Sequence, residues 1–231
     1  MKIVVLAGGL STERDVSFKT GDMVSKALRE NGHNVILLDV FMGYSDKEEN
    51  LTGIFDRTEE VSVQVKDIPE TAPDLAKVKA SRKDQSDNFF GPNVIELCQM
   101  SDIVFMALHG ENGENGKIQA AFDLFGIRYT GTGYLSSALA MDKEMSKKLF
   151  LSAGIPAPKG ASMKKADCSD DITKLGIQFP CVVKPCCGGS SIGVSIAHNA
   201  EEYKAALDEA FRWEENLIVE EYVKGREFSV G

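Results

Sequence analysis

Short apolar runs and amphipathic stretches alternate through the first 135 residues. The runs at 2–7, 35–40 and 103–108 are apolar on both faces, a pattern typical of buried strands in a parallel sheet. Between the first two runs, apolar residues recur near helical spacing from Val16 to Leu28, and Asn31-Gly32 supplies a stop signal. A helix at 118–125 and a short strand at 127–130 follow the third run. This order predicts an α/β N-terminal domain, residues 1–135, with an open, mainly parallel sheet.

Residues 42–100 interrupt this alternation. They are polar, include the charged stretches DKEEN and SRKDQSDN, and show no sustained periodicity. We predict an irregular insertion there and assign it no function.

A different pattern begins after residue 135. Residues 136–153 have helical apolar spacing, and GIPAP at 154–158 gives a stop and a stiff connector, so we predict a linking helix at 136–155. Strands are expected at 181–184, 194–197, 217–223 and from 227 onward, with a helix at 200–213. Short loops between strands favour an antiparallel sheet with helices, an α+β lobe over 156–231. Because the sequence ends in an alternating stretch, more protein is expected to follow.

Composition and charge exclude several classes of function. The net charge of -9 argues against binding to nucleic acid or to an anionic membrane. The apolar start, MKIVVLAGG, is too short to span a bilayer and is read as a buried strand. Five cysteines without a CxxC pair give no zinc site and are best explained as reduced thiols in the cytoplasm.

The strongest local chemical signal is VVKPCCGGSSIG at 182–193. Lys184 ends a predicted strand, and the glycines that follow allow backbone N–H groups to approach phosphate oxygens closely, with serine hydroxyls as further donors. The segment is not a Walker A motif, because no GK[ST] follows the glycines. Taken alone, such a loop is better explained as a plain hairpin turn, and the other motifs change that balance.

The stretch LIVEEYVKGRE at 217–227 pairs an apolar strand with acidic residues. A strand edge of this kind can present backbone groups to an adenine ring, and a carboxylate such as Glu227 can accept hydrogen bonds from ribose hydroxyls. The alternative is an exposed sheet edge with solvated charges.

Five segments occur in the order and spacing of one known family: VVLAGGLSTERDVS, ALHGENGENG, GTGYLSSALAMDK, VVKPCCGGSSIG and EEYVKGREFSVG. On these motifs the chain resembles the D-alanine–D-alanine ligases, which have the ATP-grasp fold. The resemblance implies that ATP lies between two ATP-grasp lobes, behind an N-terminal domain that holds the first amino acid. It also implies that the C-terminal ATP-grasp lobe is incomplete here, so that the chain is truncated.

The resemblance assigns roles to individual residues. Glu13 matches the glutamate that holds the ammonium of the first D-alanine, and His109 a histidine beside that substrate. Lys143 and Lys184 match the two lysines that grip the ATP phosphates. The loop over the phosphates corresponds to Gly188, Gly189, Ser190, Ser191 and Gly193, with Ser190 also linked to substrate. The adenine and ribose contacts correspond to Glu220, Tyr222, Val223 and Glu227.

Structural alternatives exist for three of these residues. Glu13 could simply complement a helix dipole, and His109 could be a structural histidine at a strand end. Lys143 could belong to a solvated helix face together with Lys147 and Lys148.

The function implied is ATP-dependent ligation of two D-alanines through an acyl phosphate for peptidoglycan precursors. The cofactors implied are ATP and Mg²⁺, and the catalytic residues are Glu13 and Ser190. The expected assembly is a homodimer. The family's metal ligands match no position up to Gly231, so no metal residue is assigned and this chain alone is expected to be inactive. Three alternatives remain: a D-alanine:D-serine or D-alanine:D-lactate ligase of the vancomycin-resistance type, or a non-catalytic nucleotide-binding fragment. A dehydrogenase is disfavoured because AGGLSTE lacks GxGxxG.

Overall fold

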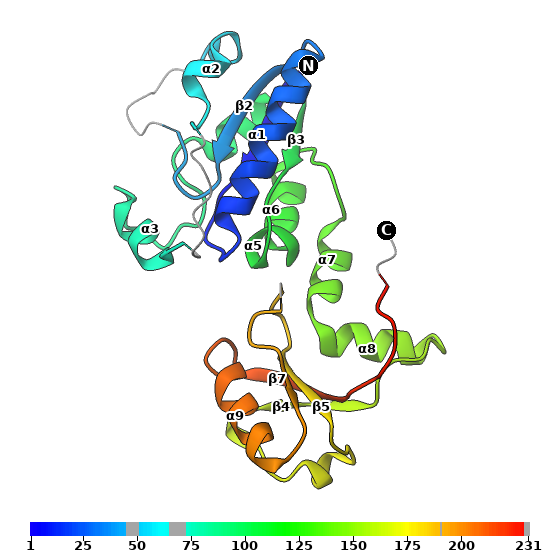
Figure 1. The fold of residues 1–231 in the computed structure, drawn as a ribbon. Coiled ribbons are helices and arrows are strands. Elements are labelled where there is room, and N and C mark those ends of the chain that lie inside the picture. The colour runs from blue at the N-terminus through cyan, green and yellow to red at the C-terminus, as the bar shows by residue number, and fades with distance from the viewer. Residues whose placement is uncertain (45–50, 65–72, 190, 229–231) are drawn as a thin grey trace. The chain divides into compact units, whose positions relative to one another are not determined.

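The computed structural model describes residues 1–44, 51–64, 73–189 and 191–228 (Figure 1). The chain forms two compact units, Met1–Ala138 and Leu139–Gly231, called here the first and second units. The division falls inside the stretch expected to form the linking helix. Within the described residues, no helix has the length and apolar character needed to cross a bilayer.

The first unit is built on a three-stranded parallel sheet, as predicted. Strands β1 (Lys2–Ala7), β2 (Asn34–Asp39) and β3 (Ile103–Met106) pair in the order β2-β1-β3. Helix α1 (Arg14–Glu30) connects β1 to β2 and packs close to both strands. A Cβ atom at Gly21 would lie 2.7 Å from Cδ1 of Leu37 and 3.0 Å from Cβ of Ala7. Glycine at this position therefore lets the helix approach the sheet closely.

The structure corrects the prediction of an irregular insertion at 42–100. Its described residues form a 3-10 turn η1 (Ile54–Asp56) and helices α2 (Thr58–Val61), α3 (Leu75–Ser81) and α4 (Val94–Met100). Ile54, Phe55 and Leu97 are buried in the same core as β1 and β2. Each helix has at most seven residues, so its apolar positions are too few to give a visible period. Residues 45–50 and 65–72 of the predicted insertion lie outside the described residues.

After β3 come α5 (Glu111–Glu114) and α6 (Lys117–Phe125). The strand expected at 127–130 is reduced to one parallel bridge between Val104 and Tyr129. The single helix expected at 136–153 is wrong, since two helices form, α7 (Tyr134–Met141) and α8 (Lys143–Ser152). Asp142 separates them because its carboxylate accepts the Met145 N–H at 2.9 Å and so caps the start of α8.

The second unit contains the predicted antiparallel sheet with a helix on one face. Strands β4 (Gly160–Lys164), β5 (Cys181–Pro185), β6 (Ser195–Ala197) and β7 (Asn216–Glu221) pair in the order β4-β7-β5-β6. Two 3-10 turns, η2 (Lys165–Asp167) and η3 (Ile172–Leu175), lie between β4 and β5. Strand β4 was not predicted. The strand expected from 227 is absent at residues 227 and 228, and 229–231 lie outside the described residues.

The two faces of this sheet have different roles. Helix α9 (Ala200–Ala210) covers one face, where Val183, Tyr203 and Val219 are fully buried in the core of the unit. Strand residues alternate between faces, so the register assigns two rows of neighbours to the opposite face. One row is Gly160, Glu220, Val182 and Ile196, and the other is Ser162, Ile218 and Lys184. Two predicted nucleotide-binding residues, Lys184 and Glu220, therefore share the face away from α9.

Candidate functional site

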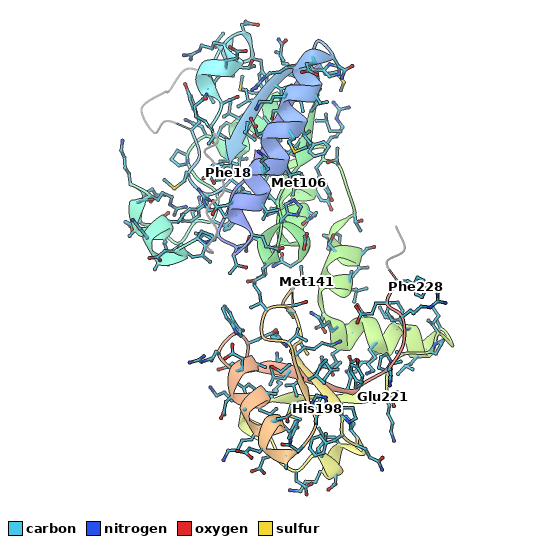
Figure 2. The ribbon with its side chains drawn as sticks, viewed as in Figure 1. Phe18, Met106, Met141, His198, Glu221 and Phe228 are labelled. Atoms are coloured by element: carbon cyan, nitrogen blue, oxygen red, sulfur yellow. The ribbon has the colours of Figure 1, made fainter. Side chains whose placement is uncertain are left out.

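In the first unit, the predicted substrate residues follow the carboxyl ends of β1 and β3. Strand β2 lies on one side of β1 and β3 on the other, so the order of the strands reverses between β1 and β3. Ligands of open parallel sheets bind at such a reversal. In Figure 2, Met106 marks the end of β3, and Phe18 lies on α1.

The loop after β1 requires glycine for two reasons. Gly8 and Gly9 have φ angles of 76° and 82°, in the left-handed region that favours glycine. A Cβ atom at Gly8 would also lie 2.7 Å from Oδ1 of Asp39 and 2.8 Å from Cζ of Phe18. The chain can therefore turn sharply beside the end of β2 and enter α1.

Two serine hydroxyls tie the loop after β1 to the loop after β3. The buried Ser17 hydroxyl accepts the Gly8 N–H at 2.9 Å and donates to the Ala107 carbonyl at 2.8 Å. The Ser11 hydroxyl donates to the His109 carbonyl at 2.7 Å and accepts the N–H of Glu13 at 3.2 Å. The backbones that carry Glu13 and His109 are thus held together.

A buried ion pair, missed in the sequence, supports the same loop. Arg14 is paired with Asp39 and donates to the Gly9 carbonyl at 2.5 Å. The Asp39 carboxylate also accepts N–H groups from Gly9 at 3.3 Å and Phe41 at 2.9 Å. The only sequence signal was an aspartate at the end of an apolar run, which does not name its partner.

The side chains of Glu13, His109 and Glu114 gather at this edge. His109 Nε2 lies 2.9 Å from the Thr20 hydroxyl, and Nδ1 lies 4.0 Å from a Glu114 carboxylate oxygen. A Cβ atom at Gly110 would be 3.1 Å from Oε2 of Glu13. Burial, and then the nearby charge of Glu13, raises the pKa of Glu114. The structure therefore brings Glu13 and His109 together, with carboxylates suited to an ammonium group beside an imidazole suited to an anion.

In the second unit, both predicted phosphate-binding lysines lie at the glycine-rich loop. Lys184 is on β5, and Lys143 begins α8. The Lys143 N–H donates to the Cys186 carbonyl at 3.0 Å, and its ammonium donates to the carbonyls of Cys186, at 3.3 Å, and Gly188. Burial, and then the charge of Lys184, lowers the pKa of Lys143. Two ammonium groups near each other in this way can attract a polyanion.

Glu220 lies between two lysines on the same sheet face. Its Oε2 is 2.5 Å from the ammonium of Lys184, and its Oε1 is 2.7 Å from the ammonium of Lys147. Burial alone raises the pKa of Glu220, but the hydrogen bonds and charges of Lys147 and Lys184 outweigh it, so the pKa lies below its usual value of 4.5. Lys147 was considered in the sequence only as part of a solvated helix face, and the structure corrects that interpretation.

The base of the loop packs against the only tryptophan of the chain. Gly193 has a φ of 70°, and a Cβ atom there would lie 2.8 Å from Cδ1 of Trp213 and 3.0 Å from Cγ of Pro185. Ser191 has a φ of 59°, unusual for a residue with a side chain. Gly188 and Gly189 precede it, and Ser190 lies outside the described residues.

The two loop cysteines are not activated thiols. Burial first, and then the carboxylate of Glu214, raises the pKa of both Cys186 and Cys187 to about 12. The Glu214 carboxylate also accepts the Cys187 N–H at 2.8 Å. Both thiols are therefore protonated near neutral pH.

The remaining predicted nucleotide contacts lie after the end of β7, which Glu221 marks in Figure 2. Tyr222, Val223 and Glu227 are exposed and belong to no helix or strand. The Tyr222 N–H donates to the Pro180 carbonyl at 3.2 Å, which attaches the start of this segment to the sheet.

Comparisons with known proteins give a consistent result. Two family models match the chain, described as the D-ala D-ala ligase N-terminus over residues 2–132 and the D-ala D-ala ligase C-terminus over residues 149–231. The chain is 44% identical over its whole length to a D-alanine–D-alanine ligase of Lacticaseibacillus casei and 42% identical to one of Pediococcus pentosaceus. It spans 64% and 65% of the length of these two relatives.

Solved structures with the same fold carry the same name. The D-alanine–D-alanine ligase of Bacillus anthracis superposes with a TM-score of 0.66 at 30% identity, over 97% of this chain and 58% of that one. A structure of the Bacillus anthracis enzyme complexed with ATP superposes with a TM-score of 0.64 at 27% identity, over 97% of this chain and 60% of that one.

Proposed function

The chain belongs to the D-alanine–D-alanine ligase family, and on that premise we propose that its second unit binds ATP and its first unit binds D-alanine, as parts of a ligase that joins two D-alanines. The observation that carries the proposal is the convergence of Lys143, Lys184 and the glycine-rich loop at one place in the second unit. The product is a D,D-dipeptide for peptidoglycan precursors.

The reaction consists of two substitutions. A carboxylate oxygen of the first D-alanine attacks the γ-phosphorus of ATP, and the bond from that phosphorus to the β–γ bridging oxygen breaks, giving an acyl phosphate and ADP. The amine of the second D-alanine then attacks the acyl carbon, the bond to the phosphate oxygen breaks, and the amine loses a proton. The products are the dipeptide, ADP and inorganic phosphate.

The residues of this chain serve mainly in binding and charge neutralisation. The Glu13 carboxylate holds the ammonium of the first D-alanine, and His109 lies beside its reacting carboxylate. Lys143 and Lys184 neutralise phosphate oxygens, which is the main electrostatic task in phosphoryl transfer. The small residues of the loop, Ser190 among them, cover the phosphates. Adenine and ribose contact Glu220, Tyr222, Val223 and Glu227.

Magnesium would neutralise the triphosphate in this reaction. The described part of the chain contains no group of three or more histidine, cysteine or acidic side chains that could hold a metal ion. A protein cage for magnesium therefore does not fit these residues. Magnesium would instead enter this unit together with ATP.

The relatives favour D-alanine over the alternatives, since those at 42–44% identity carry the D-alanine–D-alanine ligase name. All five cysteines are free, which supports a place in the cytoplasm. The expected homodimer stays a prediction that sedimentation equilibrium would test.

Fluorescence of Trp213 offers a direct test of nucleotide binding, because this residue packs against the base of the loop. Titration of the 231-residue chain with MgATP is expected to change its emission saturably, with one site per chain. A flat titration, with calorimetry showing no heat, would refute the proposal. In an assay of the intact protein, competition among D-alanine, D-serine and D-lactate as second substrate, followed by phosphate release and product mass, separates the ligase types.

A further inference from the structure

Helix α8 carries two adjacent lysines in opposite environments. The Lys147 side chain is 12% exposed, whereas that of Lys148 is 63% exposed and pairs with Glu144 one turn earlier. A lysine buried to this extent needs a partner for its charge. Lys147 has one in Glu220, so the two lysines provide a buried residue and a matched surface control.

The carboxylate of Glu220 is shared between two cations. Oε1 lies 2.7 Å from the Lys147 ammonium and Oε2 lies 2.5 Å from the Lys184 ammonium. The Glu220 side chain is only 9% exposed, so water contributes little to this arrangement. Each oxygen has its own cation, and the carboxylate cannot turn without losing one of them.

Gly160 provides the space for this pair. It lies opposite Glu220 in the β4–β7 register, and its φ is not in the left-handed region. A Cβ atom there would lie 2.4 Å from the Val219 carbonyl oxygen, 2.8 Å from Cγ of Glu220 and 2.9 Å from the Lys147 ammonium. Glycine at this position in a strand, where it is otherwise unfavourable, is thus explained by the close approach of the neighbouring β7 backbone together with these two side chains.

We propose that Lys147 is a positioning residue of the nucleotide site, which anchors the Glu220 carboxylate so that Glu220 in turn holds the Lys184 ammonium at the glycine-rich loop. This inference rests on the proposed function. Without Lys147, Glu220 and Lys184 form a neutral pair free to rotate together, and Lys184 loses both its fixed position and its excess positive charge toward phosphate.

Calorimetric titration of the 231-residue chain with MgATP tests the proposal. Lys147→Met is expected to weaken binding about tenfold, whereas Lys148→Met, which removes the same formal charge from the surface, should change the dissociation constant less than about twofold. Lys147→Arg should restore affinity to within about threefold, because it keeps a cation beside Glu220. Melting curves without nucleotide check that each variant is folded, and Lys147→Gln replaces Lys147→Met if the latter is not.

A double-mutant cycle decides whether Lys147 acts through Glu220. In a Glu220→Gln background, Lys147→Met should weaken MgATP binding by less than about twofold further. An equal loss in both backgrounds would overturn the proposal, since Lys147 would then act on ATP directly by its charge. If the original chain binds and folded Lys147→Met binds equally well, only this inference fails. If the original chain binds no MgATP, the proposed function fails as well.

Discussion

Removing the negative charge of Asp39 should destabilise the first unit strongly. The side chains of Arg14 and Asp39 are 10% and 3% exposed, so Asp39→Asn leaves a guanidinium buried without its anion. The asparagine can still accept the N–H groups of Gly9 and Phe41, and the loss is therefore mainly electrostatic. Breaking a buried pair from one side costs about 3 kcal/mol or more, the lower part of the range for such pairs.

A loss of about 3 kcal/mol corresponds to a fall in melting temperature of roughly 6–12 °C for a chain of this size. Trp213 lies in the second unit, so its fluorescence is not a direct probe of the first unit. Guanidinium unfolding by circular dichroism, with hydrogen exchange of the β1 and β3 amides, reports the first unit.

Asp22→Asn is the matched control, because Asp22 pairs with Lys26 on the surface of α1 at 2.7 Å. We expect it to change the free energy of unfolding by less than about 0.5 kcal/mol. The double variant Arg14→Met/Asp39→Asn should recover part of the loss, since it leaves no unpaired charge and keeps an acceptor for the N–H groups of Gly9 and Phe41. An effect of Asp39→Asn no larger than that of Asp22→Asn would show that the Arg14–Asp39 pair does not stabilise the first unit.

Three further predictions follow from other sites. Glu13→Gln should weaken D-alanine binding about tenfold in calorimetry by removing the charge that faces the ammonium, and unchanged affinity would exclude that role. The thiol of Cys187, with a pKa of about 12, should react with iodoacetamide at pH 7.5 at least about 100-fold more slowly than free cysteine, and peptide mass spectrometry would reveal a faster reaction. The depressed pKa of Glu220 contributes stability that is complete above its unfolded value of about 4.5 and is lost as pH falls through the folded value. The melting temperature of Glu220→Gln should therefore depend less on pH below about 4.5 than that of the original chain. Melting curves that shift in parallel for the two proteins would contradict this prediction.

The strands that could be predicted are those with continuous apolar runs. β1 and β2 were found because their residues are buried in series, which requires a strong local pattern. β4 has the mixed sequence GASMK and is a strand because it pairs with β7, a non-local cause. The break between α7 and α8 had a local signal in Asp142, but apolar spacing continues across it and concealed the cap.

The site shows the same division between local and non-local causes. Lys184 and the glycine-rich loop lie within one segment, so their chemistry is readable in the sequence, and the family motifs added Lys143. The partnership of Lys147 with Glu220 depends on the β4–β7 register and on the space at Gly160, which involves three separate segments. No periodicity in a single sequence contains that information.

Binding of MgATP to the 231-residue chain and to its Lys143→Met and Lys184→Met variants is the decisive experiment for the claim that these two lysines and the glycine-rich loop bind one triphosphate. We predict saturable binding at one site by the original chain and a loss of roughly 10- to 100-fold in affinity for each variant, the range for a hydrogen bond to a charged group. Absence of binding, or equal affinity in all three proteins, would contradict the claim.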